Sequence, residues 1–245
     1  MHLGADTPEL LSEVPLSLGS KSLDAALDVA ILVVQREADA LQHVSSAMQQ
    51  SPRMQSSFRR ALQLLLQKTR LVDGRPLGKV VVVGIGKSGI IGQKIVSMLL
   101  SLDTQAVFLH PADALHGDLG MINSPHDVIL SLSYSGNSPE IVAFMELEPV
   151  RRCARIALAG NEKSTLVQQA DVWLDCSIPG GGATPDDVRV LQSEAYPNIP
   201  APTTSTTIML ALGDALAMSL TQAKGIEKST FMKNHPGGSL GRMFK

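Results

Sequence analysis

Apolar residues change their spacing along the chain, from helical to strand-like, near residue 79. Before that point they recur every three or four positions in two stripes, which are Leu23, Leu27, Ile31, Val34, Ala38 and Leu41, then Phe58, Leu62, Leu65 and Leu66. This spacing predicts two helices joined near Ser51-Pro52, with Ser22 as a candidate cap for the first. The helical pair is expected either to cover a sheet edge or to contact another subunit. Residues 1–21 mix Pro, Gly and Ser without a period and are expected to form a flexible arm.

Five short, nearly continuous apolar runs follow the helices: Lys79–Gly84, Ala106–His110, Val128–Leu132, Arg155–Ala159 and Asp171–Cys176. Helical or polar segments separate these runs, a pattern typical of a parallel sheet covered on both faces. The predicted fold class is α/β, a three-layer sandwich around a five-stranded parallel flavodoxin-like sheet, with ligands at the carboxyl ends of the strands. Residues 22–245, leading helices included, are expected to form one domain.

A long apolar helix is predicted near the end of the chain, over Thr204–Ala223, and Gly225 ends it. Asp214 on this helix is interpreted as a buried structural hydrogen-bonding group. A glycine-rich insertion over residues 179–187 separates the fifth strand from this region. The large apolar residues of the helix are expected in the core: Met209, Leu210, Leu212, Leu216 and Met218.

Charge and composition exclude several classes of function. The 245 residues carry a formal net charge of −2, so no overall positive field would attract nucleic acid or an anionic membrane. The N-terminal segment does not resemble a signal peptide, and no apolar run approaches the roughly 18 residues of a membrane span. Cys153 and Cys176 lack metal-binding spacing and are interpreted as buried structural thiols. A cytoplasmic protein in a reducing compartment is expected.

A glycine-rich turn, Gly84–Gly89, joins the first predicted strand to a helix. Backbone amides at such a helix start can hold an anion, and glycine lets a ligand approach closely. The three glycines also match the dinucleotide fingerprint, but the second strand ends without the acidic residue that this fingerprint requires. A P-loop is disfavoured because Val81 occupies the position of its first glycine. A turn without a ligand, with Lys87 as a solvated charge, is the structural alternative.

A serine-rich loop follows the third predicted strand. Ser133, Ser135 and Ser138 can each donate a hydrogen bond, and with the amides at the next helix start they would surround a phosphate. Pro139 suits the first turn of that helix. Simple capping would need only Ser138. Three hydroxyls in six residues exceed that need, so phosphate binding is favoured.

The two loops together resemble the sugar isomerase (SIS) domain, a family that binds phosphorylated sugars. Further motifs resemble those of the arabinose 5-phosphate isomerases within it: His110-Pro111, Leu115–Gly120, Ser135–Glu140, Ser193–Pro197, Pro202–Thr207, Gly213–Ala217 and His235–Gly241. The resemblance runs from about Leu71 to the end of the chain. It implies interconversion of D-ribulose 5-phosphate and D-arabinose 5-phosphate, usually by a homotetramer.

The resemblance also implies a set of site residues. The positions of the catalytic groups are Lys87, His116, Glu140, Glu194 and His235. Those of the substrate contacts are Gly86, Ser88, His110, Ser133, Ser135, Ser138 and Thr206. In the family, the histidine at position 110 lies near the substrate and can take part in inhibitory zinc binding, while no metal is required.

Three features depart from the family pattern. The 245 residues end without the paired CBS module that many members carry, so regulation through that module is expected to be absent. The insertion before Glu194 is longer than the usual linker. Tyr134 stands where a smaller polar residue is common.

Aldose–ketose isomerisation proceeds through an enediolate and needs a base, a proton carrier for two oxygens and a positive group, without a cofactor. Glu140 or His235 is expected to move the carbon-bound proton, and Glu194 or His116 to serve ring opening and oxygen protonation. Lys87 would stabilise negative charge. His235, so near the end of the chain, could enter the site of a neighbouring subunit.

Structural alternatives exist for each of these groups. His116 could be a turn residue paired with Asp118, and Glu140 could only favour its helix start. Glu194 and His235 could simply be exposed. The alternatives for the whole chain are an SIS isomerase for another sugar phosphate and a non-catalytic sugar-phosphate sensor, which would need only the serine loop.

Overall fold

Five parallel strands form the central sheet of the computed structural model, which describes residues 20–178, 194–197 and 199–237. The strands are β3 (Val80–Gly84), β4 (Ala106–Phe108), β5 (Val128–Leu132), β6 (Ala154–Ala159) and β7 (Val172–Asp175). Their order is β4-β3-β5-β6-β7, which is the flavodoxin-like order and confirms the predicted fold class. The predicted arm and the insertion at 179–187 lie outside the described residues, apart from the start of the first helix.

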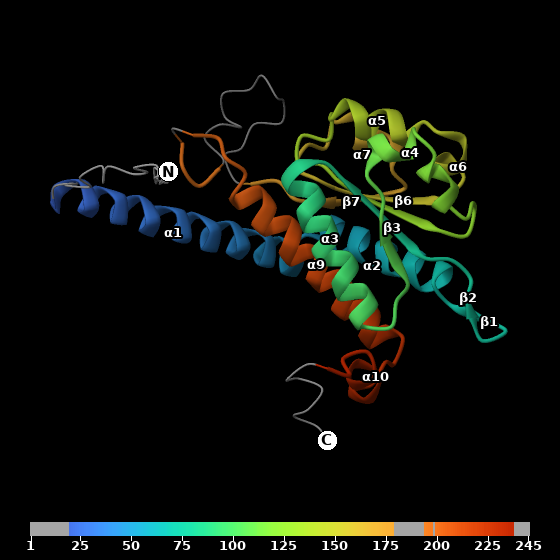
Figure 1. The fold of residues 1–245 in the computed structure, drawn as a ribbon. Coiled ribbons are helices and arrows are strands. Elements are labelled where there is room, and N and C mark those ends of the chain that lie inside the picture. The colour runs from blue at the N-terminus through green and yellow to red at the C-terminus, as the bar shows by residue number, and fades with distance from the viewer. Residues whose placement is uncertain (1–19, 179–193, 198, 238–245) are drawn as a thin grey trace, which may run out of the picture.

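Helices cover both faces of the sheet (Figure 1). On one face lie α2 (Pro52–Lys68), α3 (Gly86–Ser101) and α9 (Thr204–Ala223), and on the other α4 (Pro111–Ala114), α5 (Pro139–Met145), α6 (Glu148–Arg151) and α7 (Thr165–Gln169). Side chains of β3 alternate between them: Val80 and Val82 pack with the first group, Val81 and Val83 with the second. Full burial of this strand on both faces explains its continuous apolar run.

Close packing of α3 against α9 depends on Gly213, where an added Cβ would lie 2.6 Å from Ile95 Cγ1. Met209, Leu212 and Leu216 are buried as predicted, and Leu210 is half-buried. Two expectations for this helix were wrong. Met218 is 50% exposed, and Asp214 is a half-exposed group that pairs with Lys94 of α3 instead of a buried hydrogen-bonding group.

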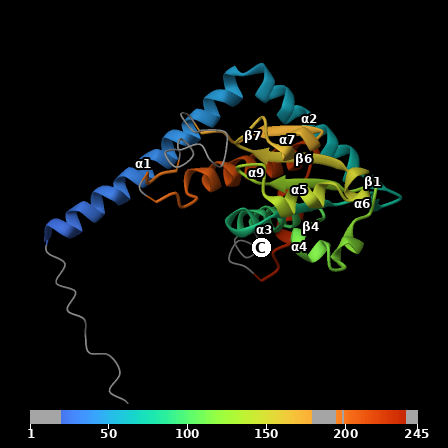
Figure 2. The ribbon, with the colours of Figure 1, turned by 90° about the horizontal axis from the view of Figure 1, so that it is seen from above.

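The helix α1 (Ser20–Gln50) extends well beyond the sheet (Figures 1 and 2). Its junction with α2 falls at Ser51, whose Oγ accepts a hydrogen bond from Met54 N at 3.3 Å, as the Ser-Pro pair predicted. The residues that α1 buries against the core are Ala40 and Val44. Its predicted apolar stripe lies on another face and is largely exposed, at 55% for Leu23, 60% for Leu27, 59% for Ile31 and 69% for Val34.

A small antiparallel hairpin, missed from the sequence, joins α2 to the sheet through β1 (Leu71–Val72) and β2 (Arg75–Pro76). Its turn residues Asp73 and Gly74 have φ values of 50° and 75°, as a type I′ turn requires. The Asp-Gly pair was the available signal. The remaining elements are the 3₁₀ helix η1 (Asp118–Met121) and α10 (Lys228–Lys233).

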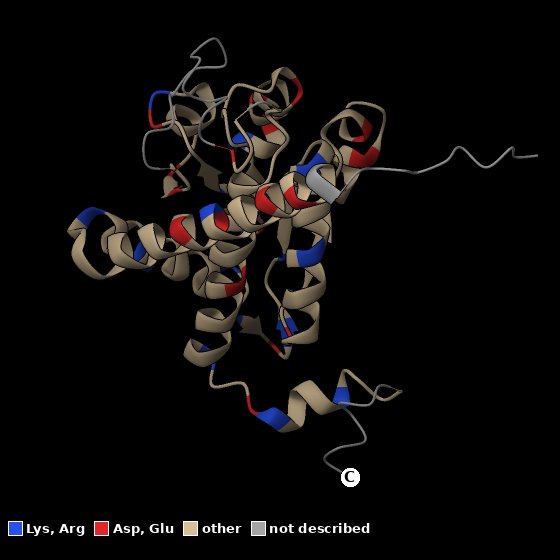
Figure 3. Ribbon diagram, turned by 90° about the vertical axis from the view of Figure 1, so that its left-hand side faces the viewer, with Lys and Arg blue, Asp and Glu red and all other residues tan. Residues whose placement is uncertain are grey.

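Acidic and basic residues are interspersed over the described elements (Figure 3). No helix in the described ranges is both long enough and apolar enough to cross a membrane.

Candidate functional site

A cavity of about 330 Å³ opens at the carboxyl ends of β3 and β5. These neighbouring strands lead to helices on opposite faces of the sheet, α3 and α5, which makes this edge the topological switch point where such folds bind ligands. Its lining comes from the glycine turn, the serine loop and the segment that leads into α9: Ile85, Lys87, Ser88, Leu132, Ser133, Tyr134, Ser135, Ser138, Ile141, Glu194, Pro200, Pro202, Ser205 and Thr206.

The glycine turn places Lys87 and Ser88 in the first turn of α3. Gly86 opens the helix with φ +56°, which explains a glycine there. Gly84 and Gly89 have a packing role, because an added Cβ on Gly84 would lie 2.9 Å from Gly89 N. Two glycines of the apparent dinucleotide fingerprint are therefore explained by close contact between β3 and α3.

The serine loop is held by its own hydroxyl groups. Ser133 Oγ lies 3.1 Å from Ser138 Oγ and accepts a hydrogen bond from Gly136 N, while Ser135 Oγ accepts one from Asn137 N. Gly136 has φ +66° and packs so closely that an added Cβ would lie 2.5 Å from Ser164 Cβ. The loop is thus a rigid turn with three hydroxyls at one wall of the cavity.

Ser138 stands at the N-cap position of α5, yet its side chain makes no capping hydrogen bond. Its hydroxyl faces Ser133 and the cavity. Simple capping therefore does not account for this serine.

Glu194 also lines the cavity and is 5% exposed. Its Oε2 accepts hydrogen bonds from Thr203 N at 2.8 Å, Thr203 Oγ1 at 3.1 Å, Thr204 Oγ1 at 3.0 Å and Ser205 N at 3.3 Å. These donors begin α9, so the carboxylate sits at the positive end of a 20-residue helix. Arg36 of α1 also reaches the backbone oxygen of Glu194, at 3.5 Å. Glu194 is therefore fixed in place, unlike a freely exposed loop residue.

The structure brings together seven of the twelve predicted site residues around one cavity: Lys87, Ser88, Ser133, Ser135, Ser138, Glu194 and Thr206. Gly86 shapes the turn without lining the cavity. Glu140 is exposed in the first turn of α5, two residues beyond Ser138, and is not among the lining residues.

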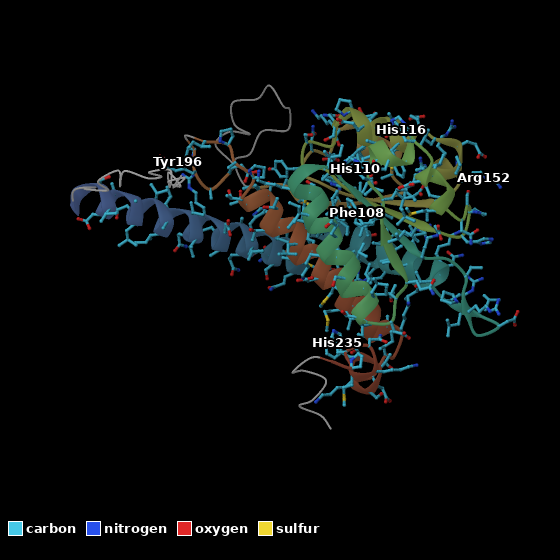
Figure 4. All side chains as sticks on the ribbon, viewed as in Figure 1. Phe108, His110, His116, Arg152, Tyr196 and His235 are labelled. Carbon is cyan, nitrogen blue, oxygen red and sulfur yellow. The ribbon has the colours of Figure 1, made fainter. Side chains whose placement is uncertain are left out.

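His110 and His116 lie at the two ends of α4 (Figure 4). His110 caps this helix through Nδ1, which accepts a hydrogen bond from Ala112 N at 3.3 Å. His116 is exposed in the turn that follows. Neither lines the cavity.

His235 lies beside α10, well apart from His110 and His116 in Figure 4. Its ring stacks on Phe231 with centroids 4.0 Å apart, and Nδ1 is 2.8 Å from the Phe231 carbonyl oxygen. It does not line the cavity of its own chain.

Several lining residues were missed as site residues. Ser205, Pro200 and Pro202 come with the approach to α9, where the run of hydroxyl residues Thr203–Thr206 before an apolar helix was a usable signal. Tyr134 was noted for its size and lines the cavity through its place in the serine loop. Ile85, Leu132 and Ile141 also line it, and nothing in the sequence set them apart from core residues.

The two thiols stand apart from this cavity. Burial raises the pKa of Cys176 well above its ordinary value, and burial also raises the pKa of Cys153. Both cysteines are buried and unbridged, as predicted. Within the described ranges, no group of three or more His, Cys, Asp and Glu side chains is placed to hold a metal ion.

The SIS domain family matches residues 76–219, more than half of the chain. The chain belongs to this family. It is 46% identical over 165 residues to the arabinose 5-phosphate isomerase KdsD of Pseudomonas aeruginosa, a match that covers 67% of this chain and 46% of that protein. It is 39% identical over 205 residues to a probable arabinose 5-phosphate isomerase of Haemophilus influenzae, covering 83% of this chain and 54% of that protein. The chain spans about half the length of these curated SIS relatives.

Among solved structures, the c3406 protein of E. coli CFT073 in complex with A5P superimposes with a TM-score of 0.70. The two chains are 27% identical, and the match covers 89% of this chain and all of that one.

Proposed function

We propose that the chain is an aldose–ketose isomerase that interconverts D-ribulose 5-phosphate and D-arabinose 5-phosphate. The observation that carries this proposal is the cavity itself, which is lined by three serine hydroxyls and by an anchored carboxylate, Glu194. The likeness to proteins named arabinose 5-phosphate isomerases supports this choice of substrate. A phosphate sensor would have no need of the buried Glu194.

The phosphate would bind at the serine loop. Ser133, Ser135 and Ser138 supply hydroxyls there, and the amino end of α3, 16 residues long, adds the positive end of a helix dipole together with Ser88. Lys87 at the same helix end supplies a full positive charge. The carbon chain of the sugar would then extend toward Glu194 and Thr206, and no cofactor or metal is needed for the reaction.

Isomerisation of the ketose begins with removal of a proton from C1, which gives an enediolate, and ends with protonation at C2. Among the described residues, Glu194 is the carboxylate that lines the cavity, and we assign it this proton transfer. Lys87 would stabilise the negative charge on the enediolate oxygens. This assignment replaces the expectation that Glu140 or His235 moves the carbon-bound proton, since neither is among the residues that line the cavity.

Transfer of protons between the two oxygens would involve His235 of a second copy. Within its own chain His235 lies beside α10, so a role in catalysis requires a neighbouring subunit. The exposed apolar stripe of α1 supports self-association, for which we propose a homotetramer with residues 22–245 as one domain. His110 and His116 remain candidates only if a second copy or a bound sugar brings them to the cavity.

The net charge of −2, with acidic and basic residues interspersed over the described elements, favours neither nucleic acid nor an anionic membrane as a partner. We accordingly expect the protein to act on a small phosphorylated sugar in the cytoplasm.

The test is to incubate the purified protein with D-ribulose 5-phosphate in the presence of a metal chelator and to measure the aldose formed by chromatography. Wild type should produce D-arabinose 5-phosphate, and Lys87→Met should lose most of the rate. Lys94→Met is the matched control, because Lys94 lies on the same helix but pairs with Asp214 outside the cavity. Thermal stabilisation by the sugar phosphate without turnover would instead indicate a sensor and contradict the proposal.

A further inference from the structure

Side chains of the serine loop alternate in direction where the loop leaves β5. Backbone pairing with β6 continues past Leu132, through Ser133 N to Leu158 O and Gly160 N to Tyr134 O. Ser133 therefore points toward Ser138 and α5, whereas Tyr134 packs with the core cluster that contains Leu132 and α9 residues. Ser133 and Tyr134 therefore point to opposite faces of the sheet, and both line the cavity.

The ring of Tyr134 is seated against Gly160, the residue after β6. An added Cβ at Gly160 would lie 2.8 Å from both Cδ2 and Cζ of the tyrosine. The backbone bond from Gly160 N to Tyr134 O, 2.8 Å long, fixes the same two residues. The ring therefore cannot move toward Gly160, and Tyr134 narrows the cavity that Glu194 also lines.

We propose that Tyr134 sets the length of the sugar phosphate that the cavity accepts and selects five-carbon over six-carbon chains. This inference rests on the proposed function, because it takes the phosphate to lie at the serine loop. With the phosphate at these serine hydroxyls, the carbon chain occupies the rest of the cavity, which the ring of Tyr134 narrows. A ligand one carbon longer must then displace a ring that Gly160 prevents from retreating. Discrimination of about tenfold or more is expected, since one methylene more or less in a binding pocket is typically worth about 10- to 200-fold.

The experiment measures binding and needs no turnover, so it separates this inference from the isomerase reaction. D-arabinitol 5-phosphate and D-glucitol 6-phosphate, which lack the carbonyl group, are titrated by calorimetry into wild type, Tyr134→Ala, Tyr134→Leu and Tyr134→Phe. Wild type should bind the five-carbon compound at least tenfold more tightly. Tyr134→Ala should reduce that ratio about tenfold, Tyr134→Phe should keep it, and Tyr134→Leu should fall between them.

Tyr134→Leu keeps apolar contact with the core cluster, so it provides the answer if Tyr134→Ala fails to fold. A wild type that binds both compounds equally would overturn the inference and leave sugar-phosphate binding intact. Equal weakening of both compounds in Tyr134→Leu would also overturn it, because Tyr134 would then have only a structural role. A wild type that binds neither compound would contradict the proposed function as well.

Discussion

Glu194 Oε2 lies 2.8 Å from the backbone nitrogen of Thr203, the N-cap residue of α9. The hydroxyl of Thr203 makes two further hydrogen bonds to the same segment: it donates one to Glu194 and accepts one from Ala195 N at 2.9 Å. Glu194, which lies outside any helix or strand, is thereby held against the start of α9. A carboxylate held in this way is positioned for proton transfer before any ligand binds.

Replacement of Glu194 by glutamine should lower kcat strongly and the free energy of unfolding only slightly. In Glu194→Gln the amide oxygen can still accept hydrogen bonds from Thr203 and Thr204, so the free energy of unfolding should fall by only about 1 kcal/mol. The amide cannot accept the C1 proton, and kcat should fall by about 10²- to 10⁴-fold. Steady-state kinetics and a thermal melt measure the two effects. Glu162→Gln is the control, because Glu162 is an exposed glutamate that pairs with Arg53. Unchanged kcat in Glu194→Gln would remove this residue from the mechanism.

Subunit mixing should show whether His235 acts in another chain. His235→Ala and Glu194→Gln proteins are each expected to be nearly inactive. When the two are unfolded together and refolded, mixed assemblies should contain sites with an intact Glu194 from one chain and an intact His235 from the other. Activity should then recover to a fraction of wild type. If both groups act within one chain, no mixing ratio will restore activity.

The sheet could be predicted from the sequence because its inner strands β3, β5 and β6 are largely buried on both faces and have continuous apolar runs, whereas the edge strands β4 and β7 are only partly buried. Val128–Leu132 has the predicted bounds, and α9 has them too. The stripe of α1 was also recognised, but its burial was not decidable, since helical spacing indicates an apolar face without indicating what covers it. The hairpin at Asp73-Gly74 was overlooked because its two-residue strands are too short to show alternation.

The cavity could be predicted only in part. The hydroxyls of the serine loop follow a buried strand, and the topology of a parallel sheet brings such strand ends together. The sequence does not reveal that Glu194 would meet the start of α9, because the donors Thr203 and Thr204 are recognisable as its partners only once the chain is folded. His235 lies beside α10 and does not line the cavity of its own chain, although its motif suggested a site residue.

A charge placed in the exposed stripe of α1 should weaken self-association. Ile31→Glu puts a carboxylate on the apolar face formed with Leu27 and Val34, where burial against a second copy would require its desolvation. Sedimentation velocity should show smaller species at micromolar concentration, with the circular dichroism of the subunit unchanged. Gln63→Glu adds the same charge at an exposed position of α2, away from this stripe, and serves as the control. Equal dissociation of both variants, or of neither, would argue against this face as the interface.

Alkaline pH should destabilise the fold through the buried thiols. Burial raises the pKa of Cys176 in the folded protein, whereas an unfolded cysteine ionises near pH 8.5. The folded state therefore keeps a proton that the unfolded state loses, and the free energy of unfolding should decline as pH rises above about 8.5, by about 1.4 kcal/mol per pH unit for each such thiol. Urea unfolding at pH 7.5, 8.5 and 9.5 measures this slope. Cys176→Ala should be less stable than wild type at pH 7.5, because it leaves a cavity, yet should show a shallower decline toward pH 9.5. Parallel declines in the two proteins would mean that the thiol of Cys176 ionises equally in both states.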